Sequence, residues 1–151
     1  MAARPARSRT LRERALGLLA RREWPRVELR ARLAKADVSE AEVESLLDDL
    51  QREGYLSDAR YAGALVRQRA GTHARRAIAS ALRERGVEPE AAREALAELD
   101  GVDELEQAKA LWQRRFGAAP RDEREKARQV RFLAGRGFPV AVALRVVREA
   151  A

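Results

Sequence analysis

Apolar residues recur at helical spacing along almost the whole 151-residue chain. Near the amino end, the apolar residues at i, i+4, i+7 and i+8 share one helix face; they are Leu11, Ala15, Leu18 and Leu19. Trp24 precedes Pro25, and the residue before a proline is pushed out of the α conformation. The pattern therefore predicts that the first helix stops at Trp24 and that Pro25 lies in the first turn of the next.

A second set of signals marks a helix that starts near residue 40. Ser39 and Glu42 form a capping-box pattern, and Val38 with Val43 forms the hydrophobic staple around it. The apolar stripe that follows ends at Gly54, where a left-handed residue is expected. No window shows sustained two-residue alternation, so the sequence predicts an all-α protein.

This order of cap, apolar stripe and terminal glycine occurs three times. Each set has a leucine five residues before the apolar residue that precedes its third helix: Leu33, Leu82 and Leu133 before Val38, Val87 and Phe138. The offsets of 49 and 51 residues are typical of helical repeats. We therefore expect three tandem three-helix repeats in an elongated, curved molecule, with one compact nine-helix bundle as the alternative. The predicted segments are a basic amino-terminal arm (1–10) and repeats at 11–56, 57–102 and 103–151.

The charge of the chain indicates a class of partner. Lysine and arginine number 31 against 24 acids, and 28 of the 31 are arginines. Such an excess of base favours polyanions or an acidic protein surface, and the planar fork of arginine suits phosphate and carboxylate. A GC-rich genome that uses arginine throughout is the alternative explanation of this bias.

Acids and bases are segregated along the chain. Residues 37–49 contain six acids and no base, 67–85 contain six arginines and one acid, and 114–136 contain eight bases against three acids. One run of this kind is most often a solvated helix face. The change of sign between successive helices favours a functional basic surface on the second and third repeats.

Patterns for catalysis and metal binding are missing from the sequence. It has no cysteine, which excludes disulfides and thiolate metal sites and fits a reducing cytoplasm. The single histidine, His73, has no nucleophile or second ligand beside it. The longest apolar run, 15–20, is far shorter than the roughly 20 residues that cross a bilayer. The sequence therefore predicts a protein that is not an enzyme, needs no cofactor or metal and does not span a membrane.

Three motifs occur in order along the chain. GYLSD at 54–58 is followed by RYA at 60–62 and VRQR at 66–69. The other two motifs are Ile78, Leu82, Arg85, Gly86 and Val87, and the Arg-Phe-Leu…Arg-Gly-Phe element at 131–138. Together they resemble the RecX family, whose members carry Gly-Tyr-Leu-Asp-Asp, then an aromatic residue, Ala and a Val/Arg cluster at the first motif. The chain departs from the family in having Ser57 in place of Asp, which a helix cap tolerates. It also has the longer segment 71–74 in place of a Gly-Pro step.

The resemblance implies a regulator of the RecA recombinase. Members of this family are built of three-helix repeats and lie in the groove of the RecA–DNA filament, where they bridge protomers. They inhibit strand exchange and DNA-dependent ATP hydrolysis, and so modulate recombination, DNA repair and the SOS response; some also bind DNA. An elongated basic arc suits such a groove, because each contact with the filament raises the effective concentration at which the next contact forms. The candidate contact residues are Arg67, Arg69, Arg75, Arg76, Arg128 and Arg131.

Three other interpretations stay open from the sequence. The candidate arginines can instead pair with the acidic third helices of their own chain. A three-helix unit can also read DNA as a helix-turn-helix, although the chain has no Asn and no helix rich in base-reading side chains. A scaffold that binds no nucleic acid is the third possibility. On the resemblance, we expect a cytoplasmic monomer that binds the RecA filament, with direct binding to DNA as a second mode.

Overall fold

The computed structural model describes residues 9–35 and 37–150, so the predicted basic arm lies largely outside the described residues. Within them the chain forms α-helices and one 3-10 turn, with no strand, which confirms the all-α prediction. The helices are α1 (Leu11–Arg21), α2 (Arg26–Leu33), α3 (Glu40–Arg52), α4 (Asp58–Arg69), α5 (Arg75–Glu84), α6 (Pro89–Leu96), α7 (Glu104–Arg115), α8 (Glu123–Gly135) and α9 (Val140–Glu149), with the 3-10 turn η1 (Ala97–Leu99) after α6.

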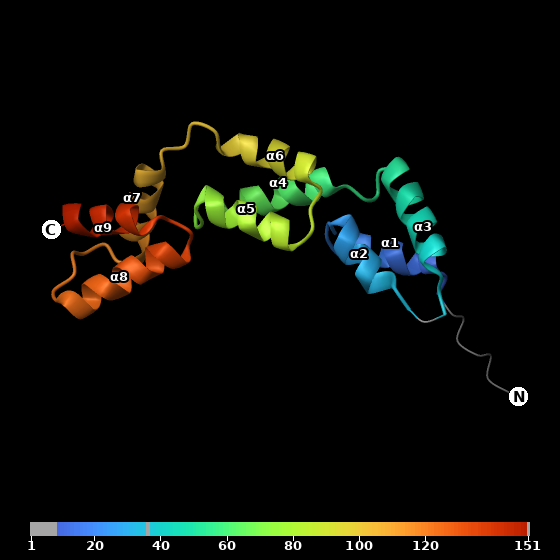
Figure 1. Cartoon of the computed structure of the whole chain (residues 1–151), viewed down its shortest axis with the longest axis horizontal. Helices are drawn as coiled ribbons and strands as arrows, with labels where there is room; N and C mark the ends of the chain where they lie inside the picture. The colour runs from blue at the N-terminus through green and yellow to red at the C-terminus, as the bar shows by residue number, and fades with distance from the viewer. Residues whose placement is uncertain (1–8, 36, 151) are drawn as a thin grey trace, which may run out of the picture.

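The helices form three consecutive trios along an open arc (Figure 1). Each trio has its own hydrophobic core. Leu33, Leu82 and Leu133 have no exposed surface, and one of them lies in each core. The tandem-repeat prediction is therefore confirmed, and the compact bundle is excluded. The repeat boundaries at 56/57 and 102/103 stay a prediction.

Side-chain caps fix several helix starts. The Ser39 hydroxyl accepts a hydrogen bond from the backbone N–H of Glu42 at 3.1 Å. The reciprocal bond of a full capping box forms at the start of α1, where the Glu13 carboxylate accepts from the N–H of Thr10 at 3.3 Å. These bonds satisfy N–H groups that have no partner inside the helix.

The first helix ends at Arg21, three residues before the predicted stop at Trp24. Trp24 folds back on the helix end, and its indole Nε1–H donates to the carbonyl of Leu18 at 3.1 Å. The Arg22 guanidinium stacks over the indole ring, 3.5 Å from its centroid. The indole thus satisfies a helix-end carbonyl, and this contact ends the helix before the proline rule applies.

The turn between second and third helices is the same in the second and third trios. Gly86 and Gly137 have φ of 70° and 95°. The N–H of the following residue, Val87 or Phe138, donates back to the carbonyl of Leu82 or Leu133 at 3.1 or 3.2 Å. This 6→1 bond around a left-handed glycine is the Schellman motif. In these two trios it explains why the fully buried leucine and the apolar residue five positions later occur together; in the first trio the N–H of Val38 donates to the carbonyl of Lys35 instead.

These glycines also lie at the junctions between trios. A Cβ on Gly86 would lie 3.1 Å from the Val27 side chain on α2, and a Cβ on Gly137 would lie 2.5 Å from the Ala77 Cβ on α5. In both cases the second helix of one trio receives the turn of the next. The absence of a Cβ therefore permits the close approach that joins neighbouring trios.

Hydrogen bonds fix the segment 71–74 that departs from the RecX pattern. The Gln107 side-chain amide donates to the carbonyls of Ala70 and His73 at 2.7 and 3.0 Å. The N–H of Ala74 donates to the carbonyl of Arg136 at 2.8 Å. Because Gln107 and Arg136 belong to the third trio, this segment is tied directly to its neighbour.

Candidate partner-binding surface

The six predicted contact residues lie on three helices. Arg67 and Arg69 are in the last turn of α4, and Arg75 and Arg76 are in the first turn of α5. Arg128 and Arg131 lie on α8. Five of the six are exposed and Arg69 is half-buried. The predicted residues are thus spread over the second and third trios.

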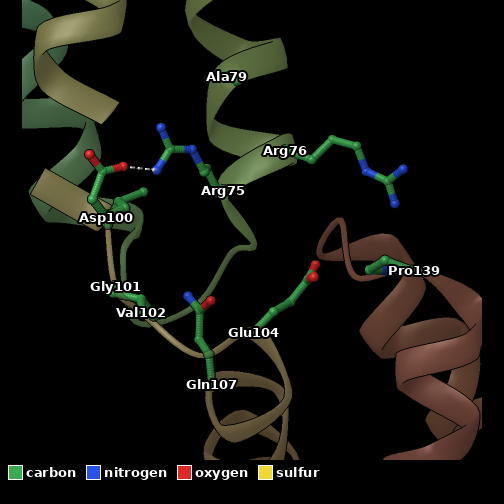
Figure 2. A pocket seen from close by; sticks show the side chains of 10 residues that line it. Arg75, Arg76, Ala79, Asp100, Gly101, Val102, Glu104, Gln107 and Pro139 are labelled. Atoms are coloured by element: carbon green, nitrogen blue, oxygen red, sulfur yellow. Dashed lines mark hydrogen bonds and ion pairs between the residues drawn. The ribbon is translucent and has the colours of Figure 1, made fainter. Parts of the chain in front are cut away.

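Two of them, Arg75 and Arg76, line a hollow between these trios (Figure 2). The hollow is also lined by Asp100, Glu104 and Pro139. Arg75 Nη1 lies 2.7 Å from Asp100 Oδ1, and the two side chains are 51% and 68% exposed. Such an exposed pair contributes little to stability. The Arg76 side chain extends away from Arg75, toward the α9 side of the hollow (Figure 2).

Five of the predicted arginines have no carboxylate within 4.0 Å among the described residues: Arg67, Arg69, Arg76, Arg128 and Arg131. Arg128 lines a second hollow, which also holds Glu125. Hydrogen bonds from Arg121 lower the pKa of the Glu125 carboxyl, and the positive charge of Arg128 adds a weaker effect in the same direction.

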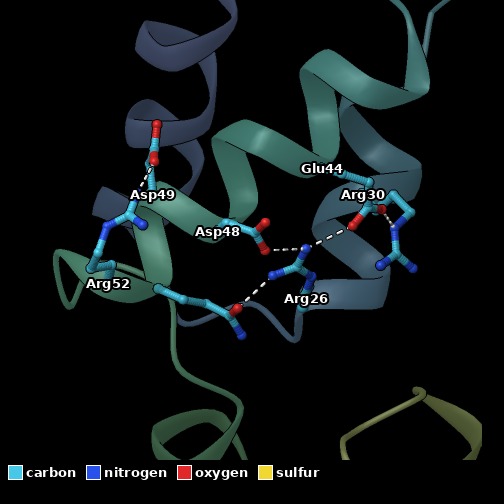
Figure 3. Close-up of polar contacts among 7 residues, drawn as sticks. Arg26, Arg30, Glu44, Asp48, Asp49 and Arg52 are labelled. Carbon is cyan, nitrogen blue, oxygen red and sulfur yellow. Dashed lines mark hydrogen bonds and ion pairs between the residues drawn. The ribbon is translucent and has the colours of Figure 1, made fainter.

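Three of the five acids of α3, Glu44, Asp48 and Asp49, pair with arginines of the first trio (Figure 3). Arg26 Nη2 lies 2.7 Å from Glu44 Oε2 and 2.8 Å from Asp48 Oδ1. Arg30 also pairs with Glu44. These hydrogen bonds, first from Arg30 and then from Arg26, lower the pKa of the Glu44 carboxyl. The acidic helix is therefore partly neutralised by the helix beside it.

The environment of His73 favours its neutral form. Burial first, and then the charges of Arg136 and Arg69, lower the pKa of its imidazole. Its Nδ1 lies 2.8 Å from the Thr72 hydroxyl. No group of three or more His, Cys, Asp or Glu residues among those described is placed to hold a metal ion. The histidine thus packs in the junction segment between trios.

Sequence reasoning missed a basic hollow on the first trio, lined by Arg9, Arg14, Gly17, Leu18, Arg21, Arg32 and Lys35. Its cations come from α1, α2 and the residues just before and after these helices, and other residues separate them in sequence, so they do not form a charge run. One signal was present: Arg14 and Arg21 are seven residues apart and share a helix face with Gly17 and Leu18.

The described residues contain no helix long and apolar enough to cross a membrane. Two family models match the chain: the RecX second three-helix domain over residues 57–96 and the RecX third three-helix domain over 102–147. The chain is similar to a "Regulatory protein RecX" from Ralstonia nicotianae, with 42% identity over 97% of this chain and 91% of the relative. It is 45% identical to one from Leptothrix cholodnii, over 93% and 89%.

Solved structures agree on the fold. A crystal structure of RecX from Lactobacillus salivarius has a TM-score of 0.70 at 19% identity, and the match covers 93% of this chain and 94% of that one. A crystal structure of regulatory protein RecX has a TM-score of 0.72 at 24% identity, over 92% and 71%. The matched domains, the sequence identity and the helical trios lead to one conclusion: the chain belongs to the RecX family of regulatory proteins.

Proposed function

We propose that this protein binds the RecA–DNA filament and inhibits strand exchange and DNA-dependent ATP hydrolysis, and so modulates recombination and DNA repair. Membership of the RecX family supports a regulatory role. The fold supports it too, because an open row of helical trios offers a long surface to an extended partner. The filament lies in the cytoplasm, so the protein would act there, as a monomer.

The observation that carries the proposal is the distribution of free arginines over the arc. Arg67 and Arg76 lie on the second trio and Arg128 and Arg131 on the third, each without a carboxylate within 4.0 Å among the described residues. Cations on separate units can contact separate subunits or phosphates of a filament. Each contact then raises the effective concentration of the next, so modest contacts give tight binding.

Charge reversal tests this role. Arg67→Glu with Arg76→Glu should weaken filament binding and inhibition of ATP hydrolysis together. Because both residues are exposed, each change should move the free energy of unfolding by no more than about 0.5 kcal/mol. Arg83→Glu with Arg148→Glu is the control, since these exposed arginines carry the same charge change at other places. Equal inhibition by wild type and the Arg67/Arg76 variant would contradict the assignment.

A DNA-binding module that acts without RecA is the second candidate, favoured by the basic hollow of the first trio. To separate the two, the same variants are measured on bare DNA at matched ionic strength. Binding should weaken with salt in either case, because cation contacts release counterions or are screened. If the Arg67/Arg76 variant loses DNA affinity but inhibits the filament normally, those residues serve DNA alone. If the wild type leaves the filament ATPase unchanged, the proposed function is wrong.

A further inference from the structure

The basic hollow of the first trio differs in its charge from four other hollows of the described surface. Five of its seven lining residues are cations and none is a carboxylate: Arg9, Arg14, Arg21, Arg32 and Lys35. Four other hollows each hold at least one acid. None of the five cations has a carboxylate within 4.0 Å among the residues described. Their charge is therefore available to an external anion.

The cations are spaced along the hollow and do not meet at one point. Arg14 and Arg21 lie seven residues apart on α1, about 10 Å along the helix axis at 1.5 Å per residue. Arg32 on α2 and Lys35 just after it extend the set onto a second helix. One strand of duplex DNA carries a phosphate about every 3.4 Å of its axis. The row thus matches a series of phosphates better than a single small anion.

Gly17 is a second feature of this hollow. It lies in the interior of α1, where glycine is less favourable than alanine because it loses more backbone freedom on folding. Packing does not require it, since the nearest atom to an added Cβ would be Arg9 Nη1 at 3.9 Å. A glycine with no internal steric reason leaves the helix backbone open to close approach by a ligand.

We propose that this hollow binds the phosphate backbone of duplex DNA. Arginine and lysine with a bare stretch of helix suit phosphate oxygens. The lining contains no aromatic side chain, so it lacks the stacking platform typical of single-strand binding. It also lacks Asn and Gln, the side chains that read adenine edges in the major groove. The proposal rests on the second candidate function and deepens it, because it names the site on the first trio and the form of DNA that the site binds.

The test uses the full chain and a fluorescent duplex of mixed sequence, with dissociation constants measured from 50 to 300 mM salt. The variant is Arg21→Gln with Arg32→Gln, which removes two cations of the hollow. The control is Arg83→Gln with Arg148→Gln, which removes the same charge. All four arginines are exposed and lie in the last turn of their helices. The variant and the control therefore lose the same favourable interaction between a cation and the carboxyl end of a helix.

Losing two phosphate contacts should lower the magnitude of the slope of log K against log salt by about 1.8. At 0.15 M salt each contact contributes about fivefold by counterion release, so the affinity should fall by at least about tenfold. The control should lose less than about twofold. An equal loss in both variants would show that net charge alone matters, and would overturn the proposal.

Gly17→Glu is a second test variant, chosen because it should remain folded. Glutamate is a good helix former, so the variant should melt at or above the wild-type temperature. Its carboxylate lies one turn from Arg14 and Arg21 and should compete with phosphate, so duplex affinity should fall. Unchanged affinity in this variant would contradict the proposal.

Three further measurements identify the partner that binds the hollow. A single strand of the same length should bind more weakly than the duplex, and the reverse order refutes the duplex assignment. Binding of poly-glutamate chains in preference to DNA would assign the hollow to an acidic protein surface. If wild type binds duplex through the hollow but leaves RecA filaments unaffected, the proposed function fails and this site stands.

Discussion

Replacing Gly137 with alanine should destabilise the protein far more than the same change at Gly101. Both glycines have left-handed backbones, with φ of 95° and 84°. They differ in their surroundings. A Cβ at Gly101 would have nothing within 4 Å, whereas a Cβ at Gly137 would lie 2.5 Å from the Ala77 Cβ and 3.1 Å from its backbone nitrogen. The comparison therefore isolates the contact between the second and third trios from the cost of the backbone conformation.

The magnitudes follow from two separate costs. A side chain in the left-handed region costs about 1–2 kcal/mol, offset in part by about 0.4–1 kcal/mol from the less flexible unfolded chain. We therefore expect Gly101→Ala to lose about 1 kcal/mol. At Gly137 the added methyl must displace α5, and overpacking of this kind adds about 1–3 kcal/mol. Gly137→Ala should lose about 2–4 kcal/mol.

Urea unfolding followed by circular dichroism at 222 nm measures both variants. Ala77→Gly in the Gly137→Ala background removes the methyl that clashes, and should restore part of the loss through a coupling of about 0.5–3 kcal/mol. Rescue is partial, because the backbone of Ala77 stays close and glycine weakens α5. Equal losses for Gly137→Ala and Gly101→Ala, with no rescue, would refute the close-approach account of the junction.

Two further predictions concern the interior and the acidic helix. Leu82→Ala removes a side chain with no exposed surface and should cost roughly 2–5 kcal/mol in urea unfolding; an unmoved midpoint would contradict the repeat alignment. Hydrogen bonds from Arg30 and Arg26 lower the pKa of Glu44 in the folded state, so their stabilisation is present above its ordinary pKa and is lost as pH falls. Glu44→Gln should therefore lose less stability than wild type in thermal melts between about pH 5 and pH 3, and identical pH profiles would count against that ion pair.

The sequence predicted the fold well where its signals are local. Caps, apolar stripes and terminal glycines each act within one or two turns, so Leu33, Leu82 and Leu133 could be aligned and placed in three cores. The end of α1 was misplaced because the Trp24 indole binds a carbonyl six residues away. A proline rule contains no information about such a contact.

The candidate surface was harder to predict because charges become neighbours only after folding. The predicted arginines came from runs in the sequence, and one of them, Arg75, is paired with Asp100, 25 residues away. The basic hollow, by contrast, combines faces of α1 and α2 whose cations are scattered in sequence. Periodicity on each helix could have shown Arg14 and Arg21 together, but their closeness to Arg32 and Lys35 follows from how the two helices pack.

The two junctions connect the fold to the proposed function. At the first, a Cβ on Gly86 would lie 3.1 Å from the larger Val27 side chain, and at the second, a Cβ on Gly137 would lie 2.5 Å from Ala77. The smaller side chain of Ala77 goes with the closer approach, so this residue pair contributes to how tightly the second and third trios dock, together with the hydrogen bonds of Gln107 and Ala74. The arginines proposed to contact a filament lie on these same two trios, which makes their separation depend on that pair. A change at Gly137 should therefore weaken binding that spans several subunits, even though Gly137 carries no charge.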